Sequence, residues 1–543
     1  MNKKRLPKST YPNRYEIELD VDLDNFSYTG AQKVDLNVVE ATNNIVLNSV
    51  GIEVTKAKIQ TTKQDIPLEV NYIEEDEKIV FESQETLSEG VYQLYLEFNS
   101  EITNDLKGFY KSSYMSEDGE KKWIATTQFE PTAARSAFPC WDEPEYKAIF
   151  SMTIITDEKY LRVSNEMVVE EEKVENNKLR TKFADSMKMS SYLVAFVIGD
   201  LEATVVGKSK TTDIRIIHRP GFSHQTSYAG TAAIKLLDFF EDYYKIPYPG
   251  TKLDLIAIPD FAMGAMENVG AVTFRENLLL FDKDKATRSE LDRSITVIAH
   301  ELAHMWFGDL VTMKWWDGIW LNEAFASLME VIASYNTYPE FKQWNAMNMS
   351  RTAGFSIDSL ENSRPVEFDV ETPDQAEEMF DVLTYEKGST VLRMFQMFIG
   401  EEAFQNGVEA YLNKFKFENT NSSDLWDALS EASNQPLNKI LPFWIREKGY
   451  PFLQVDCSNN FLTIKQKPFL LKNVDTDKNN IKPVPVQIKF LDSGNEEKFL
   501  LDDTERVIDL KNLGKVPHVN SGGWGFFHTF YDDEVFENIL ANF

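Results

Sequence analysis

The sequence predicts a multidomain α+β protein in which a strand-rich region is followed by a mostly helical region and then by strands again. The chain has 543 residues, enough for about three or four domains at roughly 150 residues each. Hydrophobic residues make up 43% and aromatic residues 13% of the chain, so each region can bury enough apolar surface to offset the entropy lost on ordering. The spacing of apolar residues changes from period 2 to helical spacing and back, which indicates the order of the three regions.

The first region, to about residue 203, alternates apolar and polar residues as half-buried strands do. Examples are YEIELDVDL, QKVDLNVV, VYQLYLEF and AIFSMTIIT, and polar stretches with Gly, Asn and Asp separate them. This spacing is typical of a sandwich or an open barrel.

Helical spacing takes over in residues 204–446, and strands return in residues 447–543. The segments SYAGTAAIKLLDFFEDYY and SELDRSITVIAHELAHMWFG place apolar residues on one helical face, and SSDLWDALSEAS predicts a shorter helix. After residue 447, FLTIKQKPF, VPVQIKFL and KFLLDD have strand patterns. We therefore expect domain boundaries near residues 203 and 447.

The charge of the chain argues against two classes of partner. Asp and Glu number 87 against 56 Lys and Arg, for a formal net charge of −31. Phosphate backbones and anionic lipid surfaces would repel such a chain, so we expect neither a nucleic-acid partner nor a membrane surface. Cationic small ligands would be favoured weakly, although solubility alone also explains the excess of acidic residues.

The cysteines and the N-terminal stretch indicate little about the function of the protein. The only cysteines, Cys140 and Cys457, lie far apart and predict neither a disulfide framework nor a cysteine metal site. The N-terminal stretch MNKKRLPKSTYPNRYEIELD is basic without an apolar run, which is not the pattern of a secretory signal. Because no run of 18 or more apolar residues occurs either, we expect a cytoplasmic protein without a membrane span.

The stretch VIAHELAHMWFGD places two histidines four residues apart in an apolar segment. On a helix, His300 and His304 lie on one face, and their imidazoles can reach one metal ion. Glu301 completes the H-E-x-x-H pattern as the general base. Ser289 with Asp292 three residues later predicts the N-cap of this helix, and Gly308 predicts its end. The alternative is a core helix with two hydrogen-bonded histidines.

A catalytic zinc ion usually has three protein ligands and an open position for water. The segment GIWLNEAFASLMEVIASY predicts a second helix, whose Glu323 lies nineteen positions beyond His304 (323 − 304). If the two helices are antiparallel neighbours, this carboxylate returns to the histidines. Glu330, two turns further on, is another candidate for a ligand or its support. The expected cofactor is one Zn²⁺ per chain.

These residues stand in a longer string that resembles a known family. HELAHMWFGDLVTMKWWDGIWLNEAFA is similar to the aminopeptidase N family of zinc metallopeptidases, the gluzincins, nearly throughout. The resemblance implies that His300, His304 and Glu323 bind zinc and that Glu301 activates water.

A second motif, FAMGAMENVGAVTF, is uninformative by itself: small residues with one carboxylate suggest an edge strand or a loop, and Glu267 could be a solvated charge. The resemblance changes this interpretation. The motif resembles the G-x-M-E-N signature that borders the substrate cleft in the family. The matching residues are Gly264, Ala265, Met266, Glu267 and Asn268. There the glutamate binds the free α-ammonium group of the substrate.

The segment TQFEPTAARSAFPCWDEP adds a second carboxylate. Glu130 matches the other family residue that binds the substrate N-terminus, and Gln128 resembles a residue of the first side-chain pocket. An ammonium group needs paired anions to offset its desolvation. Anchoring it one residue from the metal lets only the first peptide bond react, which implies an aminopeptidase acting on peptides with a free α-amine.

The segment MFDVLTYEKGSTVLRMF contains Tyr385, which by residue type alone would be a core residue of a helix. Its Y-x-K-G context resembles that of the family tyrosine that donates a hydrogen bond to the developing oxyanion. Phe380, five residues earlier, resembles a wall of the first side-chain pocket.

The resemblance covers essentially the whole chain. It implies an N-terminal β-domain (1–203), a thermolysin-like catalytic domain (204–446) and a small β-sandwich (447–543). Many members of the family continue into a large helical domain that this sequence does not include. The chain is therefore expected to be either a compact three-domain member or a truncated piece of a longer protein. Three alternatives stay open: an endopeptidase with the same zinc residues, a related epoxide hydrolase, and a catalytically silent peptide-binding protein. Side-chain preference, peptide length limit and oligomeric state are left open, a monomer being compatible with the sequence.

Overall fold

The computed structural model describes residues 5–61, 64–472 and 481–543. The first four residues of the basic N-terminal stretch therefore lie outside the described part. The chain forms two compact units. The first consists of Met1–Trp316, Glu371–Glu377 and Phe415–Thr420, and the second of Asp317–Val370, Glu378–Lys414 and Asn421–Phe543.

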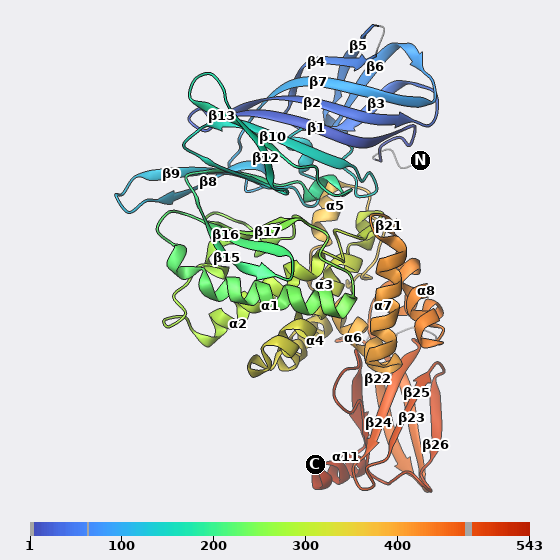
Figure 1. The fold of residues 1–543 in the computed structure, drawn as a ribbon. Helices are drawn as coiled ribbons and strands as arrows, with labels where there is room; N and C mark the ends of the chain where they lie inside the picture. The colour runs from blue at the N-terminus through green and yellow to red at the C-terminus, as the bar shows by residue number, and fades with distance from the viewer. Residues whose placement is uncertain (1–4, 62–63, 473–480) are drawn as a thin grey trace. The chain divides into compact units, whose positions relative to one another are not determined.

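The N-terminal part of the first unit is built on a ten-stranded sheet (Figure 1). In β1 the side chains alternate between buried and more exposed positions, as the sequence predicts for half-buried strands. β1 pairs antiparallel with β2 and parallel with β10. The strands, in their order across the sheet, are β12 (Val168–Lys173), β13 (Lys178–Phe183), β10 (Ile149–Asp157), β1 (Thr10–Asp22), β2 (Ser27–Val38), β7 (Gly90–Glu101), β4 (Glu53–Gln60), β5 (Ile66–Ile73), β6 (Lys78–Leu87) and β3 (Thr42–Asn48).

A smaller sheet belongs to the same unit, and its strands are interleaved in sequence with those of the large sheet. Aromatic side chains fill the core beside it, and Phe109 packs edge-on against Phe196, which also contacts Phe129. The strands across this sheet are β11 (Leu161–Ser164), β14 (Phe196–Gly199), β9 (Lys121–Gln128) and β8 (Gly108–Met115).

The remainder of the first unit is a five-stranded sheet with two helices. Helix α1 (Ser227–Tyr244) packs against β15 and β16 and against α2 (Arg288–His304), as Figure 1 shows. The sheet ends at β18, which pairs antiparallel with β19. Its strands are, in order, β15 (Glu202–Ser209), β16 (Thr212–His218), β17 (Lys252–Ile258), β19 (Ala271–Arg275) and β18 (Ala265–Met266). β20 (Thr312–Met313) and β21 (Asn419–Thr420) form a separate parallel pair.

Helices form the first part of the second unit. Helix α3 (Trp320–Thr337) packs against α4 (Gln343–Asp358), α6 (Gly388–Ile399) and the π-helical turn η8 (Leu383–Lys387). The other helices of this unit are α7 (Glu401–Phe415), α8 (Ser422–Ser433), α9 (Leu437–Ile440) and α10 (Pro442–Ile445), whereas α5 (Pro373–Glu378) belongs to the first unit up to Glu377.

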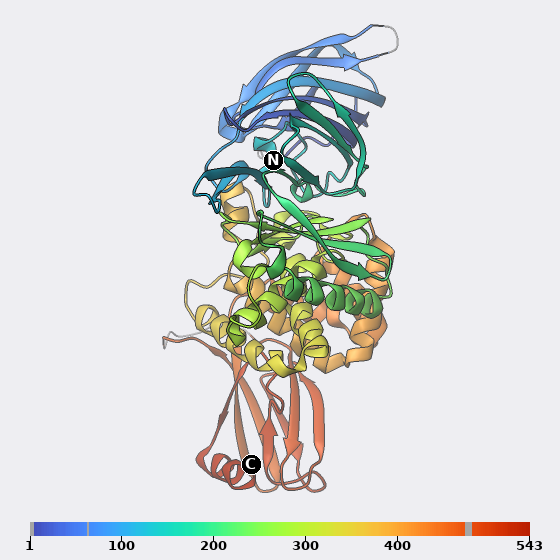
Figure 2. The same ribbon diagram turned by 60° about the vertical axis from the view of Figure 1, so that its left-hand side comes forward.

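The last part of the chain contains two sheets and a terminal helix, α11 (Asp533–Asn542) (Figure 2). The segments that the sequence assigns to strands after residue 447 form β23, β24 and β25. The four-stranded sheet consists of β26 (Glu505–Asp509), β23 (Phe461–Phe469), β22 (Tyr450–Ser458) and β28 (His528–Tyr531), and the three-stranded one of β25 (Glu496–Leu501), β24 (Val484–Phe490) and β27 (Pro517–Val519).

The predicted α+β class is therefore confirmed: strands, then helices with a small sheet, then strands again. No helix among the described residues is both long and apolar enough to cross a membrane. The division into domains at residues 203 and 447 stays a prediction.

The predicted start of the metal-motif helix is wrong by two residues. Thr287, not Ser289, is the N-cap: its side chain accepts from the Glu290 amide, and the Glu290 side chain accepts from the Thr287 amide. This reciprocal capping box satisfies two amides that otherwise lack partners, which a Ser289–Asp292 start does not. The helix ends at His304, four residues before Gly308, which adopts φ 128° in the following turn.

Candidate active site

Helix α2 carries the predicted metal motif on its last turn. His304 is buried and His300 is half-buried, and their ring centroids lie 4.7 Å apart. Glu301, between them in sequence, is buried as well. The buried face of this helix also contains Ile298 and Leu302, so the motif is held on a helix that is fixed by the core.

The turn after α2 orients the second histidine. His304 Nδ1 lies 2.9 Å from the carbonyl oxygen of Phe307. Since a carbonyl can only accept, Nδ1 carries the proton and Nε2 of the neutral ring is left as a ligand atom. A hydrogen bond from the second ring nitrogen is the usual means by which proteins orient a metal-binding histidine.

Glu267 lies close to this histidine. Its Oε1 is 3.9 Å from His304 Nδ1, and the side chain is only 3% exposed. The preceding Ala265 and Met266 form β18, the edge strand that the sequence allows for this motif. The alternative of a solvated charge at Glu267 is therefore wrong: the motif places a carboxylate inside the protein. Asn268 Nδ2 donates to Ala271 O and Thr273 Oγ1, which holds the end of the motif.

The first part of the unit contributes Gln128 and Glu130, at and just beyond the end of β9. Gln128 Nε2 lies 3.4 Å from Met266 Sδ, so the structure brings these two predicted residues together. Glu130 is buried. Two predicted carboxylates of the first unit, Glu130 and Glu267, are therefore both removed from water, where an ionised carboxylate needs a compensating positive group.

In the second unit, Glu323 is buried in the first turn of α3. Glu330, the additional candidate, is half-buried two turns later. Phe380 is half-buried just before η8, and Tyr385 is half-buried within it. Tyr385 therefore sits in a π-helical turn, a wider helical turn that is common at functional sites.

The turn η8 packs closely on α3. A Cβ atom added to Gly388 would lie 2.6 Å from Ala324 Cβ, so this close approach requires glycine. Lys387 Nζ lies 2.8 Å from Asp358 Oδ2, and both side chains are fully buried. The Y-x-K-G segment thus anchors Tyr385 to the helix that carries Glu323, one residue before Ala324.

Among the described side chains, His300, His304 and Glu323 form a group that could hold a metal ion. Two imidazoles and one carboxylate are the donor set of one class of catalytic zinc sites. Glu130 and Glu267 belong to a second group of this kind, made of carboxylates only.

Comparison with known proteins identifies the family of the chain. The peptidase M1 N-terminal domain matches residues 11–193, and the peptidase family M1 domain matches residues 228–444. The chain belongs to peptidase family M1. It is 38% identical to aminopeptidase M1-A of Oryza sativa subsp. japonica and 40% identical to aminopeptidase M1 of Arabidopsis thaliana, in each case over 98% of this chain. It is 37% identical, over 99% of its length, to the puromycin-sensitive aminopeptidase of Caenorhabditis elegans.

This M1 chain spans 61%, 62% and 58% of the length of those three relatives. The comparisons confirm the family that the sequence resembles.

The structure of the M1 chain adds two residues that sequence reasoning missed, Lys147 and Asp309. Both are buried, and within the described residues neither carboxylate oxygen of Asp309 has a hydrogen-bond partner. Burial, followed by the charge of Glu267, raises the pKa of Asp309 well above its usual value. The available signal for Asp309 was a single charged residue inside the apolar string HMWFGDLV, whereas Lys147 stands among other charged residues in DEPEYKAIF and gave no such signal.

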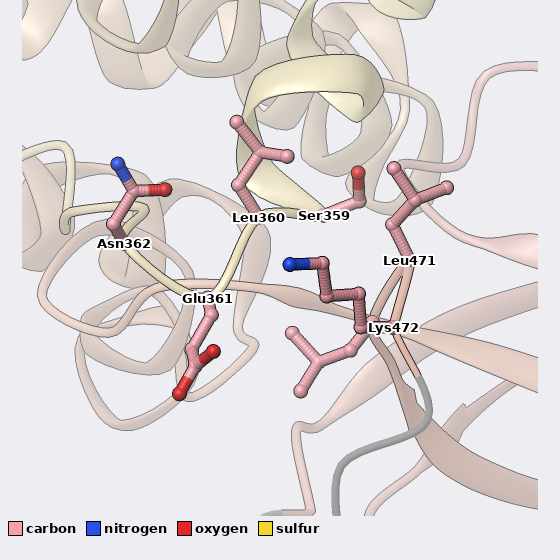
Figure 3. A pocket seen from close by; sticks show the side chains of 7 residues that line it. Ser359, Leu360, Glu361, Asn362, Leu471 and Lys472 are labelled. Carbon is pink, nitrogen blue, oxygen red and sulfur yellow. The ribbon is translucent and has the colours of Figure 1, made fainter.

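A separate cavity of about 500 Å³ lies in the second unit of the M1 chain (Figure 3). It is lined by residues that follow α4, including Glu361 and Asn362, and by Leu471 and Lys472. None of the predicted site residues lines it.

Proposed function

We propose that this chain is a zinc-dependent aminopeptidase, which hydrolyses the first peptide bond of peptides that have a free N-terminus. The observation that carries the proposal is Glu267: a carboxylate 3% exposed and 3.9 Å from His304 Nδ1. A buried carboxylate next to a metal-binding histidine fits a site for a cationic group beside the metal. The α-ammonium group of a peptide is such a cation.

The donor set fits zinc. His300 and His304 each offer a ring nitrogen and Glu323 a carboxylate oxygen, which leaves a position for water or substrate. Zinc bound there would supply the Lewis acidity that polarises the scissile carbonyl and activates the attacking water.

Glu301 is the proposed general base. It accepts the proton of the attacking water and delivers it to the nitrogen of the leaving amine, so the proton is conserved over the reaction. Glu301 is buried and adjacent in sequence to the proposed ligand His300, which places its carboxylate on the same helical turn as the metal motif. Tyr385 donates its phenolic proton in a hydrogen bond to the oxyanion that forms on the scissile carbonyl.

Glu130 and Glu267 bind the substrate α-ammonium and so set which peptide bond reacts. The hydrogen-bonded position of Asn268 and the edge strand of Ala265 and Met266 hold Glu267 in place. Gln128 and Phe380 are proposed to line the pocket for the first side chain. The remaining residue of the motif, Gly264, completes the proposed substrate-binding set.

The test compares a peptide reporter with a free α-amine and the same reporter with an acetylated α-amine. An aminopeptidase cleaves the first and fails on the second, and a zinc chelator abolishes the cleavage. Equal cleavage of both reporters would support the endopeptidase alternative. No relative named above is an endopeptidase or an epoxide hydrolase, so neither is proposed. A cytoplasmic location stays a prediction, and the oligomeric state stays open.

A further inference from the structure

The turn that follows α2 connects the metal motif to the N-terminal part of the chain. Within this turn the carbonyl of Phe307 accepts from His304 Nδ1 at 2.9 Å, and the amide of Asp309 donates to His304 O at 3.1 Å. The position of the turn therefore sets the orientation of the His304 ring, and with it the direction of Nε2.

Two side chains from outside the catalytic region hold the next three carbonyls of this turn. Lys147 Nζ donates to Asp309 O at 3.0 Å and to Leu310 O at 3.2 Å. Tyr192 Oη donates to Gly308 O at 3.2 Å. Both side chains are buried, and both come from the strand-rich region before residue 203.

Burying the ammonium group of Lys147 costs free energy, which its hydrogen bonds must offset. Its side chain is 5% exposed, and burial of an ammonium group disfavours the charged form. Accordingly desolvation lowers the pKa of Lys147 to about 7, although the charge of Asp309 opposes the shift. Its two described hydrogen bonds go to backbone carbonyls of the turn and not to the Asp309 carboxylate, so the ammonium fixes the backbone rather than closing a salt bridge.

We propose that Lys147 and Tyr192 are positioning residues of the metal site, which hold the turn of residues 307–310 so that the Phe307 carbonyl orients His304. This inference rests on the proposed zinc site. It assigns the N-terminal region a direct part in metal affinity, in addition to the substrate contacts expected from Glu130 and Gln128.

The test measures zinc affinity by competition with a chelator, together with the melting temperature of the zinc-free protein. Lys147→Met should weaken zinc binding by about 10- to 100-fold, the usual effect of removing a group that supports a metal ligand. Tyr192→Phe, which removes one hydroxyl and keeps the ring, should weaken it by a smaller factor of about 3 to 10.

Lys482→Met is the matched control. Lys482 is also a buried lysine, and its Nζ donates to the carbonyl of Phe443; its hydrogen bonds among the described residues go to none of the proposed metal-site residues. It should lower the melting temperature and leave zinc affinity unchanged.

Zinc affinity within twofold of wild type in Tyr192→Phe and in a folded Lys147→Met overturns the inference. If Lys147→Met does not fold, Tyr192→Phe decides: weaker zinc binding supports the inference and unchanged binding overturns it. A wild-type chain that binds no zinc at all would instead contradict the proposed function, so the two failures are distinguishable.

Discussion

The turn after α2 in the first unit accepts hydrogen bonds from the buried Lys147, and the turn η8 in the second unit contains the buried Lys387, but the two lysines are satisfied differently. Lys147 donates to backbone carbonyls, and the nearby Asp309 carboxylate has no hydrogen-bond partner within the described residues. Lys387 pairs with Asp358 at 2.8 Å, and Asp358 Oδ1 also accepts from Ser363 Oγ and from the amide of Gly449, each at 2.8 Å.

This difference indicates whether each lysine mainly supports the stability of the fold or the binding of the metal. Loss of Lys387 would leave a fully buried carboxylate without its cation, and such a loss typically costs about 3–5 kcal/mol of stability. Loss of Lys147 would leave two carbonyls short of a donor, at about 1–3 kcal/mol. We therefore expect the η8 region to control stability and the α2 region to control metal binding.

The largest expected effect is on turnover and comes from the α2 side. Glu301→Gln removes the general base while leaving both histidines intact, so turnover should fall by about 10²–10⁴-fold. Zinc content, measured by atomic absorption, should match wild type. A variant within tenfold of wild type in kcat would show that Glu301 is not the base.

The next effect tests the η8 ion pair. Lys387→Met should lower the free energy of unfolding by about 3–5 kcal/mol, measured by urea denaturation. The double variant Asp358→Leu/Lys387→Met should recover most of this loss, because no unpaired charge remains. If the double variant is as unstable as the single one, the buried charge is not the cause.

Tyr385→Phe tests the residue that η8 presents. Since its hydrogen bond forms mainly in the transition state, kcat should fall by about 10²–10³-fold with little change in KM. Steady-state kinetics with a free-amine reporter measures both. A rise in KM at constant kcat would place Tyr385 in substrate binding instead.

The smallest expected effect is a pH dependence of the free energy of unfolding, which comes from Lys482 near the Lys387–Asp358 pair. Burial, followed by the charge of Lys387, lowers the pKa of Lys482 from its ordinary 10.5 to about 8. The unfolded chain therefore holds more protons on this lysine between pH 8 and 10.5, so its contribution to the free energy of unfolding rises as pH increases through that window. Urea denaturation of wild type should show this rise, and Lys482→Met should lack it. Parallel curves for the two proteins would contradict the assigned pKa.

The sequence predicted the parts of this molecule that depend on local pattern. The β–α–β order, helix α1 and the helices around His300 and Glu323 follow from periodicity and residue type. The capping box at Thr287 was missed because Ser289 offers an equally good side chain, and the choice depends on where Glu290 points. The π-helical turn at Tyr385 was not predicted, and neither was the close packing of the following Gly388 against Ala324, because both join residues that no local pattern relates.

The candidate site was predictable to the same extent. Motif spacing indicated His300, Glu301, His304 and Glu323, and the family resemblance indicated Glu267. Composition could not show that Glu267 is buried, because burial depends on neighbours distant in sequence. The contact of Lys147 with the turn at Asp309 joins residues 162 positions apart. A contact between residues so far apart in sequence cannot be predicted from local sequence patterns.

The central claim is that Glu267 recognises the free N-terminus beside the metal site. The most direct measurement is the ratio of kcat/KM for a free-amine reporter to that for its N-acetylated form, in wild type and in Glu267→Gln. We predict a wild-type ratio of about 10² or more, as expected for a site with a buried charge partner, and a ratio at least tenfold lower in the variant. A wild-type ratio near one, or an unchanged ratio in Glu267→Gln, would contradict the account.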